Sequence, residues 1–392
     1  MGYKIKLAFS TILVLGATSL FATNGSELMG LGAKSRGMGG VGIGMSHGAE
    51  SALTNPALIT YVRDTEVSFG GTIFMPNVSF DNGMGAGAKD SDSDMDVIPE
   101  VSVASKIDEN FYLGVGIWGT AGMGTDYRSE PSNYNSKMVT NLQLMQFGLP
   151  LAYKMDNLSI AFTPILQYGA LDINYDAGYG SNGAGIAQDL EFGYSLGATY
   201  EIEDLTIGLV YKSQIDMDYK NQLSVAMAGF GIAYTNTKLS TPEEIGIGIS
   251  YIKDKHRIGV DYKRINYADA KGYKDFMWDD QNVYAIGYEY TFNDLALRAG
   301  YNYASSPITD QGLNGTLINT FNLLGFPAIV ESHYTVGTTY SLNKKTSFDL
   351  GLTYASNVKE TYEVMNPDGK TTRDITAEHS QTCVTLQVDF VF

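Results

Sequence analysis

The last residues of the chain place the strictest limit on its fold. In this segment the apolar side chains Val384, Leu386, Val388, Phe390 and Phe392 alternate with Thr385, Gln387 and Asp389. Side chains that alternate with a period of two point to opposite faces of a β-strand. The segment is therefore predicted to be a strand with one apolar and one polar face, ending on an aromatic residue.

The same alternation recurs along the chain after residue 64. Its clearest examples begin at Phe192, Leu205, Ile245 and Tyr284, and the residues between the apolar positions are mostly Gly, Ser, Thr and Glu. A soluble β-sandwich would place large apolar residues on its inner faces. Small and polar inner faces instead indicate a barrel whose interior holds water or a ligand.

The length and composition of the chain are compatible with a membrane barrel. The 392 residues include 44 Gly, 27 Tyr and 17 Phe, and the mean hydropathy is −0.09. No run reaches the roughly 18 to 20 apolar residues of a membrane-spanning helix, so a span must be a strand. We expect an all-β transmembrane antiparallel barrel, with tyrosine and phenylalanine concentrated at the lipid boundaries.

The connections between the runs predict how the barrel is oriented. Short turns such as Glu203-Asp204, Asn293-Asp294 and Asn343-Lys344-Lys345 alternate with long connections, the longest near residues 221–239 and 307–328. Outer-membrane barrels have short periplasmic turns and long external loops. The segmentation predicts about 14 strands, and an even number brings both ends to the same side.

Residues 1–22 have the features of a secretory signal peptide. Lys4 and Lys6 precede the mostly apolar segment 7–20, and Leu20-Phe21-Ala22 is a plausible cleavage site. The formal net charge of the chain is −17, and cleavage would remove two more positive charges. Such a charge argues against nucleic acid as a partner.

Residues 23–63 do not continue the strand pattern. This segment is rich in glycine between Gly30 and Gly44, and short Ala-rich pieces follow it. Glycine permits close packing of backbones, so we expect a compact plug, or hatch, inside the lumen. The predicted organisation is a signal peptide (1–22), a hatch (23–63) and a barrel (64–392).

Two motifs in the hatch resemble a known family. Gly32-Ala33-Lys34-Ser35-Arg36-Gly37-Met38-Gly39-Gly40, followed by Asn55-Pro56-Ala57-Leu58, is similar to the hatch of the FadL/TodX family of hydrophobic-compound transporters. The likeness extends through Trp118-Gly119-Thr120-Ala121-Gly122 and Thr241-Pro242-Glu243-Glu244. It ends at Phe390 and Phe392, which look like the assembly signal read by the barrel assembly machinery.

The resemblance implies a function for the chain. Family members are plugged barrels of 14 strands that carry long-chain fatty acids or aromatic hydrocarbons across the bacterial outer membrane without a cofactor. External loops capture the ligand, and a gap in the wall releases it sideways into the membrane, away from lipopolysaccharide. We expect a monomeric carrier of hydrophobic small molecules, most simply fatty acids. Aromatic hydrocarbon uptake, a structural or adhesive surface barrel and a general porin are the alternatives.

Candidate ligand contacts follow from the loops and from the resemblance. The 307–328 connection is unusually apolar for a loop that faces water, and it contains Leu317, Phe321, Leu324 and Phe326. These residues either capture ligand or pack against neighbouring loops. Fatty-acid carriers of the family place cations in the pocket, and the resemblance puts Lys274 near such a position. A solvated loop lysine is the favoured alternative for this residue.

One departure from the family pattern affects the substrate prediction. Tyr175 stands where the resemblance implies an arginine. A buried carboxylate that lacks a full ionic partner is costly, which weakens the fatty-acid assignment and makes a neutral hydrocarbon a fair competitor.

The remaining reactive residues do not predict an enzyme or a metal centre. Asp90, Asp92, Asp94 and Asp96 lack the spacing of an EF-hand, and they are either a solvated acidic loop or a cation site. The four histidines show neither metal-ligand spacing nor a nucleophile motif. Cys383, the single cysteine, is expected to be a lumen-facing filler rather than a reactive thiol.

Overall fold

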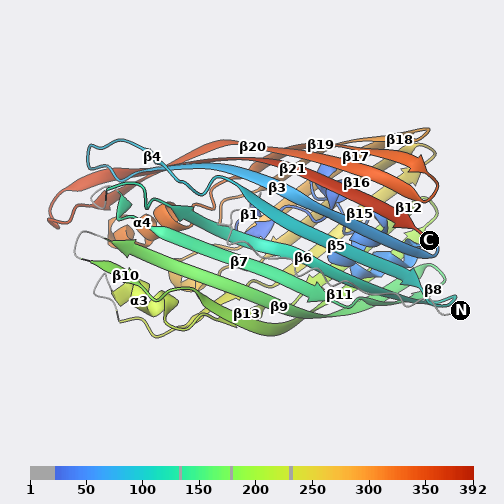
Figure 1. Cartoon of the computed structure of the whole chain (residues 1–392), viewed down its shortest axis with the longest axis horizontal. Helices are drawn as coiled ribbons and strands as arrows, with labels where there is room; N and C mark the ends of the chain where they lie inside the picture. Colours follow the sequence, from blue (N-terminus) through green and yellow to red (C-terminus); the bar gives the residue numbers. More distant parts are fainter. Residues whose placement is uncertain (1–22, 132–134, 177–179, 229–232) are drawn as a thin grey trace, which may run out of the picture.

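The computed structural model describes residues 23–131, 135–176, 180–228 and 233–392, so the predicted signal peptide lies outside the described residues. The described chain forms a closed antiparallel barrel (Figure 1), in which the last strand pairs with the first long strand of the wall. Counting β7 and β8 as one span, the wall has 14 strands, which confirms the predicted fold class. Among the described residues, no helix is both long and apolar enough to cross a membrane.

The wall strands follow one another in chain order around the barrel. Their bounds are β3 (Thr65–Asp81), β5 (Asp96–Lys106), β6 (Phe111–Asp126), β7 (Val139–Gly148), β8 (Leu151–Met155), β9 (Leu158–Asp176), β11 (Ala187–Ile202), β12 (Leu205–Lys212), β15 (Glu244–Lys253), β16 (His256–Ile265), β17 (Gln281–Phe292), β18 (Leu295–Ala304), β19 (Ser332–Asn343), β20 (Thr346–Met365) and β21 (Thr372–Val391).

Short turns and long connections lie at opposite ends of the barrel, as the sequence predicts (Figure 1). The long connections carry the small elements β4 (Lys89–Asp90), β10 (Ser181–Gly183), β13 (Ile215–Asp218), α3 (Gln222–Ala228), β14 (Lys238–Thr241), η3 (Tyr273–Phe276), η4 (Leu313–Gly315) and α4 (Thr316–Gly325). These elements fold together over one mouth of the barrel, which we refer to as the loop end.

Alternation along each strand separates the lipid face from the lumen. On β15, Ile245, Ile247 and Ile249 are exposed, while Glu244 and Ser250 are buried. On β21, Leu386, Phe390 and Phe392 are exposed, whereas Cys383, Thr385, Gln387 and Asp389 are buried. The polar set of the last strand therefore faces inward, as predicted. The lipid contact of the apolar set supplies the hydrophobic free energy that holds the barrel in the membrane.

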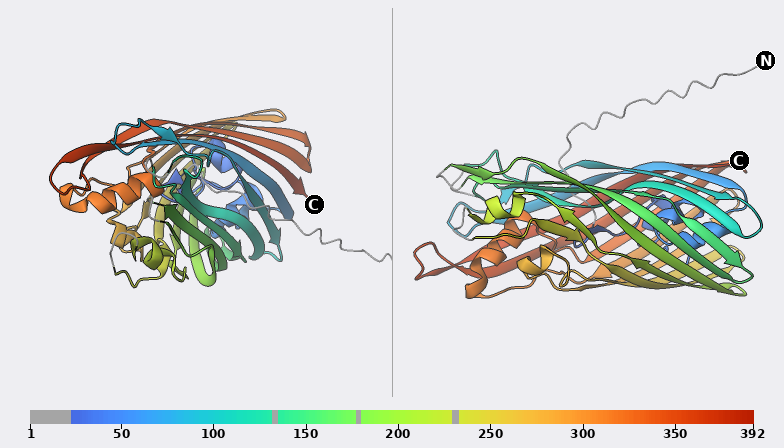
Figure 2. Two further views of the ribbon diagram at one scale, coloured as in Figure 1. Left: turned by 60° about the vertical axis from the view of Figure 1, so that its left-hand side comes forward. Right: turned by 90° about the horizontal axis from the view of Figure 1, so that it is seen from below.

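Residues 23–63 fold inside the barrel (Figure 2), nearer to the end with the short turns. They form β1 (Thr23–Asn24), β2 (Glu27–Leu28), α1 (Ala33–Gly37), η1 (Gly48–Leu53) and η2 (Pro56–Tyr61). Nearly all of these residues are buried although the elements are short. The segment therefore occupies the lumen as a hatch, whose structure depends on contacts with the wall more than on its own helices.

Glycine allows the hatch backbone to touch the wall directly. A Cβ atom added to Gly44 would lie 2.6 Å from the carbonyl carbon of Gly248 on β15. A Cβ atom added to Gly300 on β18 would lie 2.2 Å from the backbone nitrogen of Gly39. Neither distance is compatible with a side chain, which gives a physical reason for the glycine-rich composition of the hatch.

The wall is interrupted between β5 and β6. Their pairing runs from Lys106 and Tyr112 to Glu100 and Trp118, and no pair joins the two strands beyond that point in the described chain. Farther along, β6 pairs with β7, and its register shifts between Gly119 and Ala121. This β-bulge at Thr120 lies at the start of the stretch where β5 and β6 are unpaired, which we call the gap in the wall.

The first residues of the hatch occupy the inner side of this gap. Glu27 on β2 pairs with Ala121 on β6, and the N–H of Gly122 donates to the carbonyl of Ser26 at 3.2 Å. Leu28, Ile98 and Trp118 belong to one buried apolar cluster beside it. In this state the gap is closed from within by hatch residues and apolar side chains.

Candidate functional site

An apolar cluster fills the lumen at the loop end. It combines wall residues such as Leu142 and Ile173 with residues of the long connections, among them Tyr219, Trp278 and Phe321, all of which are buried. The rings of Tyr267, Tyr273 and Trp278 lie 4.7 to 5.1 Å apart, centroid to centroid. The loop end is therefore a packed apolar region that leads from the outer surface into the barrel.

The apolar residues predicted in the 307–328 connection form α4 and the segment after it. Phe321, Leu324 and Phe326 are buried, and the Phe321 ring lies 4.8 Å from Phe276 and 5.5 Å from Phe326. Leu317 is half-buried, one helical turn before Phe321. The buried residues pack against neighbouring loops, and the start of the helix remains accessible from outside.

The two residues chosen for a carboxylate head group lie apart from each other. Lys274 is on η3 with an exposed side chain. Tyr175 is buried at the loop end of β9, and its hydroxyl donates to the carbonyl of Ala226 at 2.7 Å. Neither residue lines the cavities described below, so their roles in ligand binding remain predictions.

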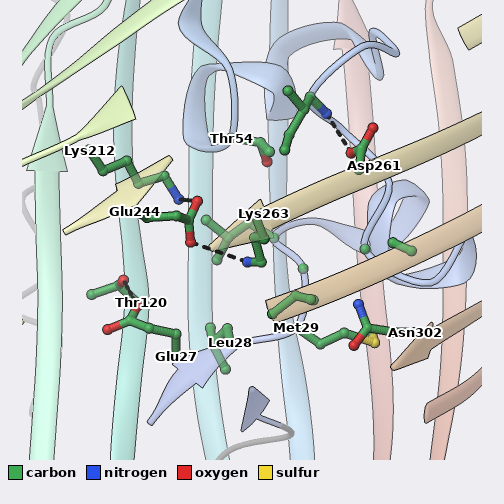
Figure 3. Close-up of a pocket in the computed structure, with 16 residues that line it drawn as sticks. Glu27, Leu28, Met29, Thr54, Thr120, Lys212, Glu244, Asp261, Lys263 and Asn302 are labelled. Carbon is green, nitrogen blue, oxygen red and sulfur yellow. Dashed lines mark hydrogen bonds and ion pairs between the residues drawn. The ribbon is translucent and has the colours of Figure 1, made fainter. Parts of the chain in front are cut away.

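A cavity lies between the hatch and the wall (Figure 3). On one side of it, the carboxylate of Glu244 on β15 forms ion pairs with the Nζ atoms of Lys212 on β12, at 3.1 Å, and of Lys263 on β16, at 3.2 Å. Asp261 lines the same cavity, and its carboxylate accepts hydrogen bonds from the N–H groups of Gly42 and Ile43 at 2.7 and 2.8 Å. The wall thus contributes both charges and hatch anchors here.

A second cavity adjoins the first. Glu27, Thr120, Lys212 and Glu244 line both cavities. Thr120 is the bulged residue at the interruption of the wall. The charged cavities therefore lie directly behind the gap between β5 and β6.

Glu27 lacks the ion pairs that hold Glu244. Its Oε2 accepts a hydrogen bond from the Thr120 hydroxyl at 3.3 Å, and its buried Oε1 has no partner among the described residues. Burial, assisted by the negative charge of Glu244, raises the pKa of Glu27 from 4.5 to about 7. This carboxyl is consequently able to hold a proton near neutral pH.

The Asn-Pro-Ala motif folds the hatch locally. Asn55 caps η2 by accepting the N–H of Ala57 at 3.1 Å, while its side-chain amide donates to the carbonyl of Ile43 at 2.7 Å. Pro56 occupies the first helical position, where a missing N–H costs nothing. All three motif residues are buried, which gives them a structural position in the hatch rather than a contact with the cavities.

Ion pairs attach α1 of the hatch to the wall. Arg36 donates to Glu100 of β5 at 2.7 Å, and both side chains are almost fully buried. Lys34 forms an ion pair with Asp389 of β21. Because an unpaired buried charge is costly, each ion pair favours one position of the hatch relative to the wall.

The acidic stretch at residues 90–96 does not form a cation site in the described part of the chain. Asp90, Asp92 and Asp94 are exposed, and Asp96 is buried. No group of three or more His, Cys, Asp and Glu side chains is placed to hold a metal ion among the described residues.

The sequence prediction did not single out Glu27, Lys212, Glu244 or Lys263 as site residues. Glu244 belongs to the Thr241–Glu244 motif, and both Glu244 and Lys212 occupy inward positions at strand ends. A polar residue at a lumen-facing position was the available signal. Its partner could not be inferred, because the partners lie on different strands.

Comparisons with known proteins agree with this architecture. A family model described as "Outer membrane protein transport protein (OMPP1/FadL/TodX)" matches residues 17–392. The long-chain fatty acid transport protein of Escherichia coli K12 is 20% identical over 388 residues, covering 80% of this chain and 85% of its own length.

Two solved structures share the fold. A Pseudomonas aeruginosa FadL homologue superposes with a TM-score of 0.72 at 14% identity, covering 93% of this chain and 99% of its own. The Ralstonia pickettii toluene transporter TbuX gives 0.67 at 17% identity, with the same coverage. Both are similar in fold to the barrel and hatch described above.

Proposed function

This chain belongs to the OMPP1/FadL/TodX family of outer-membrane transport proteins, and from that premise we propose that it takes up hydrophobic compounds and releases them sideways into the membrane. The family and fold are those of transport channels rather than enzymes. The observation that carries the proposal is the interruption between β5 and β6, which lies against a lumenal cavity.

The proposed route begins at the loop end. Leu313 is exposed and Leu317 is half-buried at the accessible start of α4, while Met277 beside η3 is exposed. Apolar side chains on an outer surface offer a first contact for a hydrophobic solute. The apolar cluster beneath them provides a continuous path of low polarity toward the cavities.

The exit is the gap in the wall. Where the pairing of β5 and β6 ends, Ile98 of β5 packs over Gly119 of β6. Leu28 of the hatch belongs to the same apolar cluster as Ile98. Small movements of these side chains and of β2 would connect the cavity with the lipid. An apolar solute that leaves here avoids the aqueous periplasm, so its transfer needs no energy source.

The charges of the cavity bear on the cargo. Lys212 and Lys263 are already paired with Glu244, and Glu27 and Asp261 add two further acids. An isolated carboxylate anion would therefore gain little there. Aromatic hydrocarbons and long-chain fatty acids both remain within the proposal, and the electrostatics favour a cargo that enters without a net charge.

A disulfide across the gap tests the exit. A Cβ atom at Gly119 would lie 4.0 Å from the Cβ of Ile98, which is within the range that disulfides span. The variant Ile98→Cys/Gly119→Cys, built on Cys383→Ala, should therefore oxidise readily. We expect oxidation to lower the uptake of labelled oleate or toluene by cells lacking their own carrier, and reduction to restore it.

A second disulfide supplies the matched control. Val103 and Val115 face each other where β5 and β6 are already paired, so oxidation of Val103→Cys/Val115→Cys should leave uptake unchanged. Equal uptake by the oxidised and reduced Ile98/Gly119 pair would exclude the β5–β6 gap as the exit. Steady large conductance of the intact protein in planar bilayers would instead favour a general porin.

A further inference from the structure

Glu27 is held by its backbone with its carboxyl directed into the cavity. The pairing of Glu27 with Ala121 fixes the strand position, and the side chain extends from there toward Thr120 (Figure 3). One carboxyl oxygen accepts the Thr120 hydroxyl, and the other, Oε1, faces no hydrogen-bond donor of the described chain. A buried acceptor without a donor is costly, and this cost is relieved if a ligand supplies the donor.

The neighbouring cations do not satisfy Glu27. Lys212 and Lys263 reach different oxygens of Glu244 at 3.1 and 3.2 Å. Their positive charges offset only part of the effect of burial and of Glu244 on Glu27, whose pKa is raised to about 7. Glu27 is therefore a carboxyl of the cavity that readily takes up a proton.

The other titratable groups near Glu27 are Glu244, Asp261, Tyr267 and Tyr273. Two backbone N–H groups of the hatch donate to Oδ2 of Asp261, and its Oδ1 has no hydrogen-bond partner among the described residues. The Tyr267 hydroxyl donates to the carbonyl of Asn24 at 3.0 Å. Burial holds the pKa of both Tyr267 and Tyr273 above the usual value, so both phenols stay neutral.

Apolar side chains extend from the charged end of the cavities. Ile165 and Ile215 line the second cavity, Val283 lines the first, and all three belong to the apolar cluster of the loop end. Leu28 and Met29 of the hatch complete the apolar lining near Glu27. A ligand with an apolar tail and one small polar head would thus find both parts of the site.

We infer that Glu27 binds the head group of an amphiphilic carboxylic acid, with one proton shared between the two carboxyl groups. The acid O–H donates to Oε1 of Glu27, or a protonated Glu27 donates to the ligand carboxylate. With the shared proton, Glu27 and the ligand together carry one negative charge rather than two, in a cavity that also holds Glu244 and Asp261 against two lysines. This inference rests on the proposed function, and it makes Glu27 a specificity-determining residue for acids over hydrocarbons.

The inference predicts proton uptake on binding. Below about pH 7, Glu27 already holds the proton, so the affinity for an ionised ligand should be independent of pH. Above that pH one proton must be taken up with each ligand, so the dissociation constant should rise about tenfold per pH unit. The probe is dodecanoic acid, titrated calorimetrically into the purified full-length protein at pH 6, 8 and 9 in two buffers of different ionisation enthalpy.

We expect one proton per dodecanoic acid at pH 8 and 9, and none at pH 6. In Glu27→Gln the amide can donate without titrating, so the uptake and the pH slope should both disappear. Glu243→Gln is the matched control, because Glu243 accepts from Tyr211 at 2.8 Å and does not line either cavity. This control should keep the slope of the parent protein.

Two results would overturn the inference. One is binding of dodecanoic acid by the parent protein at pH 8 without proton uptake, and the other is an unchanged slope in Glu27→Gln. Heat-modifiable migration in gels verifies that each variant is folded. Toluene uptake separates the two proposals: if it persists while the proton linkage is absent, only the role of Glu27 fails, and if no apolar solute enters, the carrier function fails.

Discussion

The ion pair between Arg36 and Glu100 is predicted to hold the hatch in its seat. Arg36 donates to Glu100 at 2.7 Å, to the carbonyl of Gly30 at 2.8 Å and to the Thr385 hydroxyl at 3.3 Å. The side chains of the pair are only 4% and 3% exposed. The substitution Arg36→Ala would leave Glu100 buried without its cation, beside the gap in the wall.

The expected magnitude follows from this burial. Breaking a buried ion pair by removing one partner costs about 3–5 kcal/mol. Since about 1.4 kcal/mol is a factor of ten, the population of molecules with a displaced hatch should rise by roughly two to almost four orders of magnitude. Replacing both partners, as in Arg36→Met/Glu100→Leu, should recover most of this loss because no charge is left unpaired.

The single cysteine of the chain is a built-in reporter of hatch position. Cys383 is 1% exposed and shares a cluster with Leu28, Leu31 and Leu53 of the hatch. A maleimide can reach it only when the hatch moves away, so the labelling rate in purified protein measures the displaced population. Arg36→Ala should therefore label at least a hundredfold faster than the parent protein.

A surface ion pair of the same length provides the control. Lys154 and Glu201 are also 2.7 Å apart, but their side chains are 26% and 28% exposed. Such pairs contribute below about 1 kcal/mol, so Lys154→Ala should change Cys383 labelling by less than about fivefold. Labelling of Arg36→Ala within that same limit would refute the role of the buried pair.

Three further predictions use the same structure. Gly44→Val would place its Cβ 2.6 Å from Gly248, so it should displace the hatch and accelerate Cys383 labelling more than any surface substitution. Burial lowers the pKa of His47 from 6.5 to about 3, so between these pH values His47 takes up a proton only when the hatch is displaced. The hatch should therefore be held less firmly in the barrel as the pH falls from 6.5 towards 3, and His47→Gln should flatten the pH dependence of Cys383 labelling. Phe321→Ala removes a ring that is 2% exposed and should cost about 3–5 kcal/mol locally, measured as faster protease cleavage of the external loops in intact cells; unchanged cleavage would argue against tight packing of α4.

The sequence by itself determined the barrel. Alternation along strands such as β15 and β21 is a local property. In a strand between lipid and lumen, successive side chains point to opposite faces, so apolar and polar residues must alternate. Asn-rich and Asp-rich turns such as Asn293-Asp294 mark hairpins for an equally local reason. The predicted strand number, the inward face of the last strand and the alternation of short and long connections were therefore confirmed.

The position of the glycine-rich segment follows from its composition and from the resemblance of its motifs to a known hatch. Small residues indicated close packing, and the structure places Gly39 and Gly44 against the wall. The partners of the hatch could not be predicted, because they lie far away in the chain. Arg36 is paired with Glu100, and Lys34 is paired with Asp389 at the opposite end of the sequence.

Only the tertiary structure decided which residues form the cavity and where the pairing of the wall strands is interrupted. Closure of the barrel brings Lys212, Glu244 and Lys263 together from three strands and sets Glu27 of the hatch beside them. Lys274, selected from its spacing in the sequence, lies outside that cavity with an exposed side chain. The physical reason is that strand alternation specifies which way a side chain points, whereas charge pairing, the bulge at Thr120 and the seat of the hatch depend on segments that meet only after folding.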